Sequence, residues 1–284
     1  MSNYDEELEK EIPEFKDSHE GKKSEFDISA TMSVVQIHGW KQIIGIISVA
    51  IIIIGCWEFF IRLFNVPGYV FPSPSAIVVA LIRSIPTIYT HFFITLGELA
   101  SGFAIGASIG FIMAAILTQI PFIEKIITPY IIVLVTTPTL ALVPLLMLRL
   151  GFGIFPRIIA VALAVGPMVM INSVTGFRRT DLAKIALAKS YGAKTWQIFL
   201  KIRFPLALPM INVGLLVGGI FGLITAVGAD MVGGKMGLGN KIAYYSSLAR
   251  MANFFGVILL VSIIGISIWL AVTKIGQKYA SWQE

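Results

Sequence analysis

Charge is scarce in this chain of 284 residues: only 13% of them are Asp, Glu, Lys or Arg, whereas 56% are hydrophobic. One soluble core of this size cannot bury so much apolar surface, which excludes an ordinary soluble globular protein. The sequence therefore predicts an integral membrane protein whose first partner is the lipid bilayer. The formal net charge of +6 does not call for nucleic acid, because ten of the 16 acidic residues precede residue 28 and only the remainder is basic.

Cysteine and histidine are also scarce. Cys56 is the single cysteine, which excludes an internal disulfide. His19, His38 and His91 are scattered, with neither the spacing of metal ligands nor a nucleophile nearby. The phosphate-binding pattern GxxxxGK[ST] is missing too. We therefore expect no catalytic residues, no metal site and no cofactor bound by this chain itself, which is not an enzyme on this interpretation.

Six apolar runs are each long enough to cross a hydrocarbon layer of about 30 Å, which takes about 20 helical residues. They lie near residues 43–64, 92–118, 123–148, 156–176, 207–229 and 253–275. The sequence thus predicts an all-α fold of six transmembrane helices over residues 43–284. Residues 1–42 are expected to form a polar N-terminal tail that lacks the regions of a cleaved signal peptide.

The loop between the fourth and fifth runs concentrates positive charge. It holds seven basic residues against the single acid Asp181: Arg178, Arg179, Lys184, Lys189, Lys194, Lys201 and Arg203. The positive-inside rule places this loop in the cytoplasm. An even number of spans then puts both termini in the cytoplasm, in agreement with Lys274 and Lys278 after the last run.

The second run carries Gly102, Gly106 and Gly110 at four-residue spacing. Small residues repeated at this interval make one face of a helix smooth enough for another helix backbone to approach closely. We interpret this face as a packing surface.

Prolines interrupt the third and fourth runs at Pro138, Pro144 and Pro167. Each removes a backbone donor and tends to kink a helix, which a membrane tolerates where neighbouring helices or a water-lined cavity satisfy the freed carbonyls. Bent helices around a path suit a transporter, and kinks that only improve packing are the alternative. The residues expected along a substrate path are Thr95, Glu98, Pro138 and Pro167.

Acidic residues within the spans are few enough to interpret one by one. Glu58 precedes Arg62 by four residues, so the two should pair on one helix face. Glu124 adjoins Lys125 at a helix start and is expected to be a surface charge. Glu98 has no local partner, which leaves two interpretations: it lines the path, or it pairs with a distant cation. Asp230 precedes the glycine-rich segment MVGGKMGLGN, which is a hairpin or a gate, with the hairpin favoured.

The basic loop is also amphipathic. Thr180 or Asp181 can cap a short helix that Gly192 ends or bends. A second amphipathic turn then leads to Pro205 and Pro209, which suit the first turn of the fifth span. The loop therefore predicts a helix–turn–helix lever, joined directly to two transmembrane helices, that a soluble partner could push.

The same loop carries a spaced motif. Ala186-Leu187-Ala188, three residues, Gly192, nine residues and then Ile202-Arg203-Phe204-Pro205 resembles the EAA motif of permease subunits of bacterial binding-protein-dependent ABC importers. The match holds at Ala188, Gly192, Ile202 and Pro205. It departs at Ala186, where the family usually has Glu, and also at Leu187 and Phe204. Docking here would then rely on shape and apolar contact.

Three further stretches resemble the nitrate, sulfonate and taurine branch of these permeases, which also includes pyrimidine and riboflavin importers. They are VFPSPSAI at 70–77, TPTLALVPLLMLRLGFG at 137–153 and AD-x-VGG-x-x-GLG at 229–239. The resemblance covers roughly residues 40 to 280.

The resemblance implies a type I ABC importer permease fold in a bacterial inner membrane, with a coupling loop at 178–205. It implies a second copy of the chain, two cytoplasmic ATPase subunits that bind ATP and Mg, and an extracytoplasmic substrate-binding protein. The residues that it assigns to ATPase coupling are Ala186, Leu187, Ala188, Lys189, Gly192 and Ala193. Many anion-importing relatives have a basic residue near the position of Glu98, so the acid here favours a neutral, nitrogen-rich nutrient such as a pyrimidine.

Other classes of protein stay open at this point. A secondary transporter or channel would need internal repeats or ionisable relays, and an intramembrane enzyme would need paired catalytic groups at membrane depth. The basic loop alone would also fit a membrane anchor for a soluble complex. Only the importer predicts a stoichiometric ATPase partner.

Overall fold

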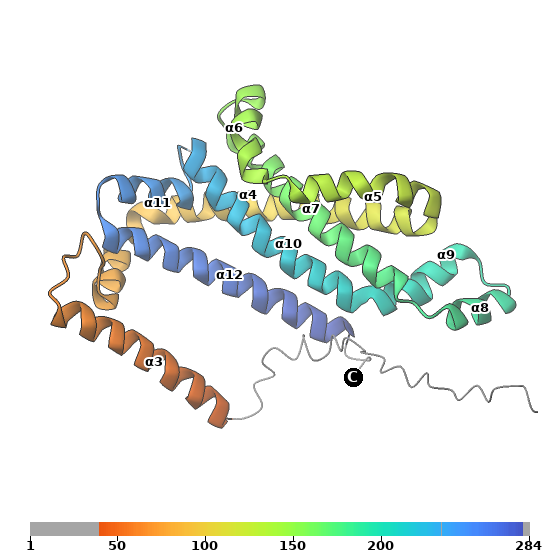
Figure 1. Cartoon of the computed structure of the whole chain (residues 1–284), viewed down its shortest axis with the longest axis horizontal. Coiled ribbons are helices and arrows are strands. Elements are labelled where there is room, and N and C mark those ends of the chain that lie inside the picture. The colour runs from red at the N-terminus through yellow and green to blue at the C-terminus, as the bar shows by residue number, and fades with distance from the viewer. Residues whose placement is uncertain (1–39, 234, 281–284) are drawn as a thin grey trace, which may run out of the picture. The chain divides into compact units, whose positions relative to one another are not determined.

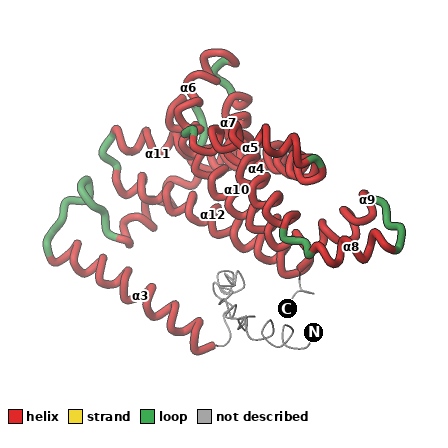
Figure 2. Tube along the Cα trace, turned by 45° about the vertical axis from the view of Figure 1, so that its right-hand side comes forward, coloured by secondary structure: helices red, strands yellow, loops and turns green. Residues whose placement is uncertain are grey.

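The computed structural model describes residues 40–233 and 235–280, and this part of the chain consists of helices and loops (Figure 2). The expected tail over residues 1–42 lies outside the described residues except for its last three, which already belong to a helix. The helices are α3 (Trp40–Leu63), α4 (Pro74–Gln119), α5 (Pro121–Thr136), α6 (Thr139–Leu150), α7 (Ile154–Arg178), α8 (Leu182–Ser190), α9 (Thr195–Ile198), a π-helical turn (Phe199–Arg203), α10 (Phe204–Gly233), α11 (Leu238–Ser247) and α12 (Met251–Ala280).

The described residues hold five helical segments that could each cross a membrane, and a sixth crossing, as predicted, if the bent pair α5 and α6 counts as one. Together α5 and α6 are apolar enough for one span, but they are bent at the break between them. The helices of the crossings extend beyond the apolar runs. In particular α4 begins at Pro74, where the Ser73 hydroxyl accepts a hydrogen bond from the Ala76 amide and caps the helix.

The third crossing is not the continuous helix that the sequence predicted over 123–148. It breaks between α5 and α6, which meet at 90°. Pro138 stands at the N-cap of α6, where its missing amide proton prevents the α5 ladder from continuing. Pro144 and Pro167, by contrast, lie inside α6 and α7 without ending them.

The core of the body packs α4 and α10 against α7 (Figure 1). Gly102, Gly106 and Gly110 are buried on the face of α4 that meets α7, so the predicted packing face is confirmed. An added Cβ at Gly106 would lie 2.5 Å from the carbonyl oxygen of Ala162. Only glycine permits this approach of two backbones.

The fifth crossing starts earlier than predicted. Helix runs without a break from Thr195 through the π-helical turn and α10 to Gly233; Pro205 stands in the first turn of α10, as predicted, whereas Pro209 lies inside it. A π-helical turn accommodates a residue that a regular helix would not, and such turns are frequent at functional sites. The lever is thereby fused to the fifth crossing. As Figure 1 shows, α8 and α9 lie at one end of α10 and α11 lies at the other.

The end of α3 is tied to the start of α4 through Glu58. Its carboxylate accepts hydrogen bonds from Arg62 Nε at 2.7 Å, Ser75 Oγ at 2.7 Å and the Ser75 amide at 3.0 Å. The predicted pair of Glu58 with Arg62 is confirmed. The part of α3 up to Ile53 belongs to a separate unit, and no residue of α3 is buried.

Candidate functional site

The predicted coupling loop forms a helix, a turn and a second helix. Asp181 caps α8 by accepting a hydrogen bond from the Ala183 amide at 2.8 Å. Gly192 ends it with φ +75°, a left-handed conformation that glycine adopts without strain. Ile185 is the buried anchor of α8. Ala186, Leu187 and Lys189 of the same helix are exposed.

The exposed surface of this loop is unusually apolar for a segment outside the membrane core. Leu187 is 60% exposed and Tyr191 is 83% exposed, while Trp196 and Leu200 continue the same character into the next helical segment. We name Leu187, Tyr191, Trp196 and Leu200 the coupling patch. Large apolar side chains exposed together on one short segment make it a candidate contact surface.

Aromatic packing joins the loop to the crossings. The ring of Phe199, in the π-helical turn, lies 5.0 Å from the ring of buried Phe177 in α7. Phe111 of α4 contacts both Phe177 and Phe204 of α10, at 6.0 and 5.9 Å between ring centroids. A displacement of the loop therefore reaches three crossings through close-packed rings, which do not compress.

Glu124 is not the surface charge that the sequence predicted. It does stand in the first turn of α5, but it is buried and forms an ion pair with Arg178 at the end of α7, rather than lying free on the surface. The sequence suggested only its neighbour Lys125 because a partner 54 residues away is brought there by helix packing. This pair closes the same end of the body from which the coupling loop leaves.

The break in the third crossing borders a small pocket of about 140 Å³. Pro138 and Pro167, two of the residues expected along the path, both line it. Thr136, Thr137 and Thr139 also line it, and the hydroxyls of Thr136 and Thr137 both donate to the Val133 carbonyl, at 3.0 and 2.8 Å. Irregular backbone at membrane depth is tolerated where it lines a cavity, and broken helices of this kind form substrate sites in transporters.

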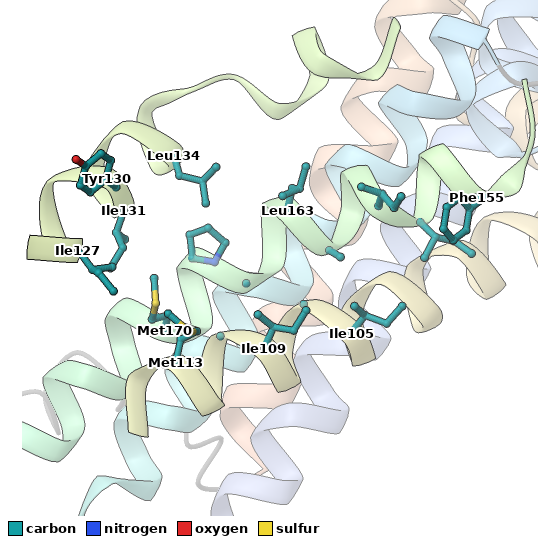
Figure 3. Close-up of a pocket in the computed structure, with 17 residues that line it drawn as sticks. Ile105, Ile109, Met113, Ile127, Tyr130, Ile131, Leu134, Phe155, Leu163 and Met170 are labelled. Carbon is teal, nitrogen blue, oxygen red and sulfur yellow. The ribbon is translucent and has the colours of Figure 1, made fainter. Parts of the chain in front are cut away.

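A larger groove of about 460 Å³ lies between α4, α5 and α7 (Figure 3). Its walls are aliphatic side chains, among them Ile105, Ile109, Leu134 and Leu163, and the hydroxyl of Tyr130 points away from it. No charged group lines it, so it offers nothing to orient a polar solute. An apolar groove of this type fits lipid or another helix better than a nutrient.

A buried cluster of charges holds the other two residues expected along the path. Arg157 of α7 places its Nη1 atom 2.5 Å from Asp230 Oδ1 of α10 and 2.7 Å from Glu98 Oε1 of α4. The side chains are 6%, 0% and 1% exposed, respectively. Thr95 donates its hydroxyl to Asp230 Oδ2 at 2.6 Å. Of the two interpretations of Glu98, the structure shows pairing with a distant cation.

Within this cluster the two carboxylates are held differently. Asp230 accepts hydrogen bonds from Arg157 and Thr95, whereas neither oxygen of Glu98 has a well-aligned hydrogen bond to another described residue. Glu98 is thus held less firmly than Asp230, although its Oε1 atom lies 2.7 Å from Arg157 Nη1. Asp230 lies in the last turn of α10, before the glycine-rich segment, and pairs with Arg157.

Arg157 is the residue of this cluster that the sequence analysis missed. It stands near the start of the predicted fourth span, close enough to the membrane edge to pass as an interfacial cation. Two acids could have pointed to it. Glu98 lies within a predicted span and Asp230 directly follows one, and acids in such places need a cation from another span. Sequence spacing could not single out Arg157, since its partners are distant along the chain.

Comparison with known proteins decides the family. Residues 106–280 match the family described as "Binding-protein-dependent transport system inner membrane component". The chain belongs to this family. It is therefore a permease subunit of a binding-protein-dependent ABC importer and a multi-pass protein of the inner membrane, and the permease itself is the non-catalytic component.

Curated relatives agree along most of the permease. A "Probable ABC transporter permease protein" of Haemophilus influenzae is 28% identical over 216 residues, which cover 76% of this chain and 88% of the relative. The "Formylaminopyrimidine transport permease protein ThiX" of Halalkalibacterium halodurans is 26% identical over 234 residues, which cover 80% and 91%.

The fold also has solved counterparts. An inward-facing structure of the MetNI methionine ABC transporter has a chain with a TM-score of 0.57 at 18% identity, covering 71% of the permease and 97% of that chain. This likeness supports the type I importer fold expected from the sequence. The family match supports the importer over a secondary transporter or channel that works without an ATPase.

Proposed function

We propose that the permease couples ATP hydrolysis by two cytoplasmic ATPase subunits to uptake of a small polar nutrient. The observation that carries the proposal is the coupling patch, four exposed apolar side chains that run from α8 to the π-helical turn, on a segment joined to α7 by ring contacts. ATP and Mg would bind to the ATPase subunits. Each ATPase would receive α8 through the predicted coupling residues: Ala186, Leu187, Ala188, Lys189, Gly192 and Ala193.

The contact between α8 and the ATPase would be mainly apolar. Ala186 is exposed at the position where the family usually has Glu, so this helix offers no carboxylate there. Leu187 and Tyr191 supply apolar area instead, each able to contribute about 1.5–3 kcal/mol on full burial. Lys184 and Lys189 border this area, and they suit an acidic rim on the ATPase.

The coupling loop would face the cytoplasm, because seven basic residues lie between 178 and 203. Six crossings then place both chain ends in the cytoplasm. α11 follows the opposite end of α10 and would face outside, where a substrate-binding protein would dock. A second copy of the chain would complete the path, with a related permease in its place as the alternative.

We place the substrate path at the break between α5 and α6. Pro138, Pro167 and the three threonines around them support this location, because they border a pocket with hydroxyl groups at the level of a broken crossing. Thr95 and Glu98 would act on the path only indirectly, since they are buried in the ion cluster.

The charge of Glu98 is no guide to the substrate. Its proximity to Arg157 removes the argument that a free acid would repel an anion, so the earlier preference for a neutral pyrimidine loses its basis. The ThiX relative is named for formylaminopyrimidine transport. Anionic and neutral small nutrients are both compatible with the threonine-lined pocket.

The experiment that tests the proposal is purification of the tagged permease in mild detergent with the proteins expressed beside it. We expect a stoichiometric nucleotide-binding subunit whose ATP hydrolysis is inhibited by vanadate, and its loss when Leu187 is replaced by Asp. A permease that purifies alone and still moves solute after reconstitution would overturn the proposal.

A further inference from the structure

The segment between α10 and α11 is fastened to the body at several points. The Gly237 amide donates to His91 Nδ1 at 3.0 Å, and the Leu238 amide donates to Thr95 Oγ1 at 2.8 Å. Both acceptors stand on α4, more than 140 residues earlier in the sequence. The first residues of α11 are thereby fixed to a crossing that is not their neighbour along the chain.

Arg157 adds a third point of attachment, from α7. Its Nη1 atom donates to the Met236 carbonyl at 3.0 Å in addition to Asp230 Oδ1 at 2.5 Å. One guanidinium therefore holds both the end of α10 and the segment that follows it. Guanidinium groups suit this role because their several donors lie in one rigid plane.

Two glycines allow the start of α11 to lie close against α10. A side chain at Gly237, where φ is +114°, would overlap the carboxylate of Asp230, and one at Gly239 would overlap the carbonyl oxygen of Val227. Leu238 between them is completely buried. Residues 236–238 of the glycine-rich segment, which the sequence suggested as a hairpin or a gate, are thus docked against α4 and α7.

We propose that Arg157 is a positioning residue for transport: together with Asp230 and Thr95 it locks the start of α11 to α4, α7 and α10, so that these four helices move as one body. This inference rests on the proposed function, because it concerns how a displacement at the coupling patch arrives at the other side of the membrane. α10 is continuous with the lever at one end and carries Asp230 near the other. The bonds from Arg157 and Thr95 would keep this end of α10 from moving separately from α4, α7 and α11.

Glu98 provides a control within the same cluster. It approaches Arg157 but bonds to none of residues 236–238 among the contacts that the structure describes, so removing its charge leaves every link to α11 in place. Arg157→Gln removes the links from α7 to both Asp230 and Met236. Arg157→Lys keeps one positive charge with fewer donors and serves as the conservative variant.

The test measures how fast a buried cysteine reacts with a maleimide in the purified complex, with Cys56 replaced by Ala. In this background Leu238→Cys reports on the lock, Met236→Cys is the exposed reference, and Ala207→Cys is a buried reference at the coupling end of α10. We expect Leu238→Cys to be protected both without nucleotide and in the vanadate-trapped state. Adding Arg157→Gln should speed its labelling at least tenfold, with Ala207→Cys still protected.

The remaining variants complete the test. Glu98→Gln should leave Leu238→Cys protected, and Arg157→Lys should restore part of the protection and part of the uptake per ATP that Arg157→Gln loses. Unchanged protection in Arg157→Gln, labelling of Ala207→Cys as well, or labelling of Leu238→Cys in the vanadate-trapped parent would each overturn the inference. Failure of the proposed function would look different, since no ATPase would co-purify although the labelling pattern could still be measured on the permease.

Discussion

Arg157 and Asp230 are 73 residues apart in sequence, yet a nitrogen of one lies 2.5 Å from an oxygen of the other in the interior of the protein. With Glu98 beside them, one cation faces two acids. Charges taken out of water are stable only when they compensate each other with good geometry, so the three residues depend on one another.

Arg157→Met should therefore destabilise the permease strongly. It leaves two buried carboxylates without a cation, which we expect to lower the free energy of unfolding by about 3–5 kcal/mol. Thermal unfolding in detergent, followed by loss of monodisperse protein on size exclusion, measures the effect. The triple variant Arg157→Met, Glu98→Gln, Asp230→Asn removes all three charges and should recover a large part of the loss. A single variant as stable as the parent would contradict a compensating cluster.

Glu98→Gln separates a path role from a pairing role. Because Glu98 is buried against Arg157, we expect the substrate concentration at half-maximal uptake to stay within about twofold of the parent, with any change appearing in thermal stability. Uptake by the reconstituted complex and its melting temperature are the two measurements. A large change in affinity or selectivity with unaltered melting would return Glu98 to the path.

Gly106→Ala should disturb the contact between α4 and α7. The new methyl group would lie 2.5 Å from the Ala162 carbonyl oxygen, and overpacking of this kind costs about 1–3 kcal/mol. Gly97→Ala is the matched control on the same helix, because nothing lies within 4 Å of its added Cβ. The control should be neutral or slightly stabilising in the same melting assay. Equal effects of the two changes would mean that helix propensity, not packing, governs this face.

Leu187→Asp should release the ATPase without unfolding the crossings. The side chain is exposed, so the cost falls on the apolar contact with the partner, and we expect at least a tenfold loss of co-purified ATPase. Ala186→Glu is the control. Ala186 is also exposed, and Glu is the residue that the family usually has there, so this change should leave assembly within about twofold of the parent. Full assembly and uptake in Leu187→Asp would remove the coupling patch from the mechanism.

Thr139→Trp should block uptake by filling the pocket at the α5–α6 break, whose volume of about 140 Å³ leaves little room beside an indole. ATPase assembly should survive, because the pocket is remote from α8. Ile132→Trp is the control, since this exposed residue of α5 lines neither the pocket nor the larger groove. Normal uptake in Thr139→Trp would place the path elsewhere.

Much of this architecture follows from patterns that are local in the sequence. The number of crossings follows from the lengths of the apolar runs, the close contact of α4 with α7 follows from the spacing of Gly102, Gly106 and Gly110, and the end of α8 follows from Gly192. Each depends on residues within a few turns of one another. The family resemblance was carried by the same kind of local signal, the spacing of Ala188, Gly192 and Pro205.

What the sequence by itself determined is thus the class of protein, its crossings and its coupling loop. Only the tertiary structure decided which charges meet: Glu98 pairs with Arg157 instead of standing alone, and Glu124 pairs with Arg178 instead of facing solvent. It also decided that the start of α11 is hydrogen-bonded to Thr95 and His91 of α4. It also decided that the third crossing bends by 90° at Pro138, while Pro144 and Pro167 leave their helices intact. The physical reason is that hydropathy and helix periodicity act between neighbours along the chain, whereas a buried charge is compensated by whichever helix the packing brings beside it.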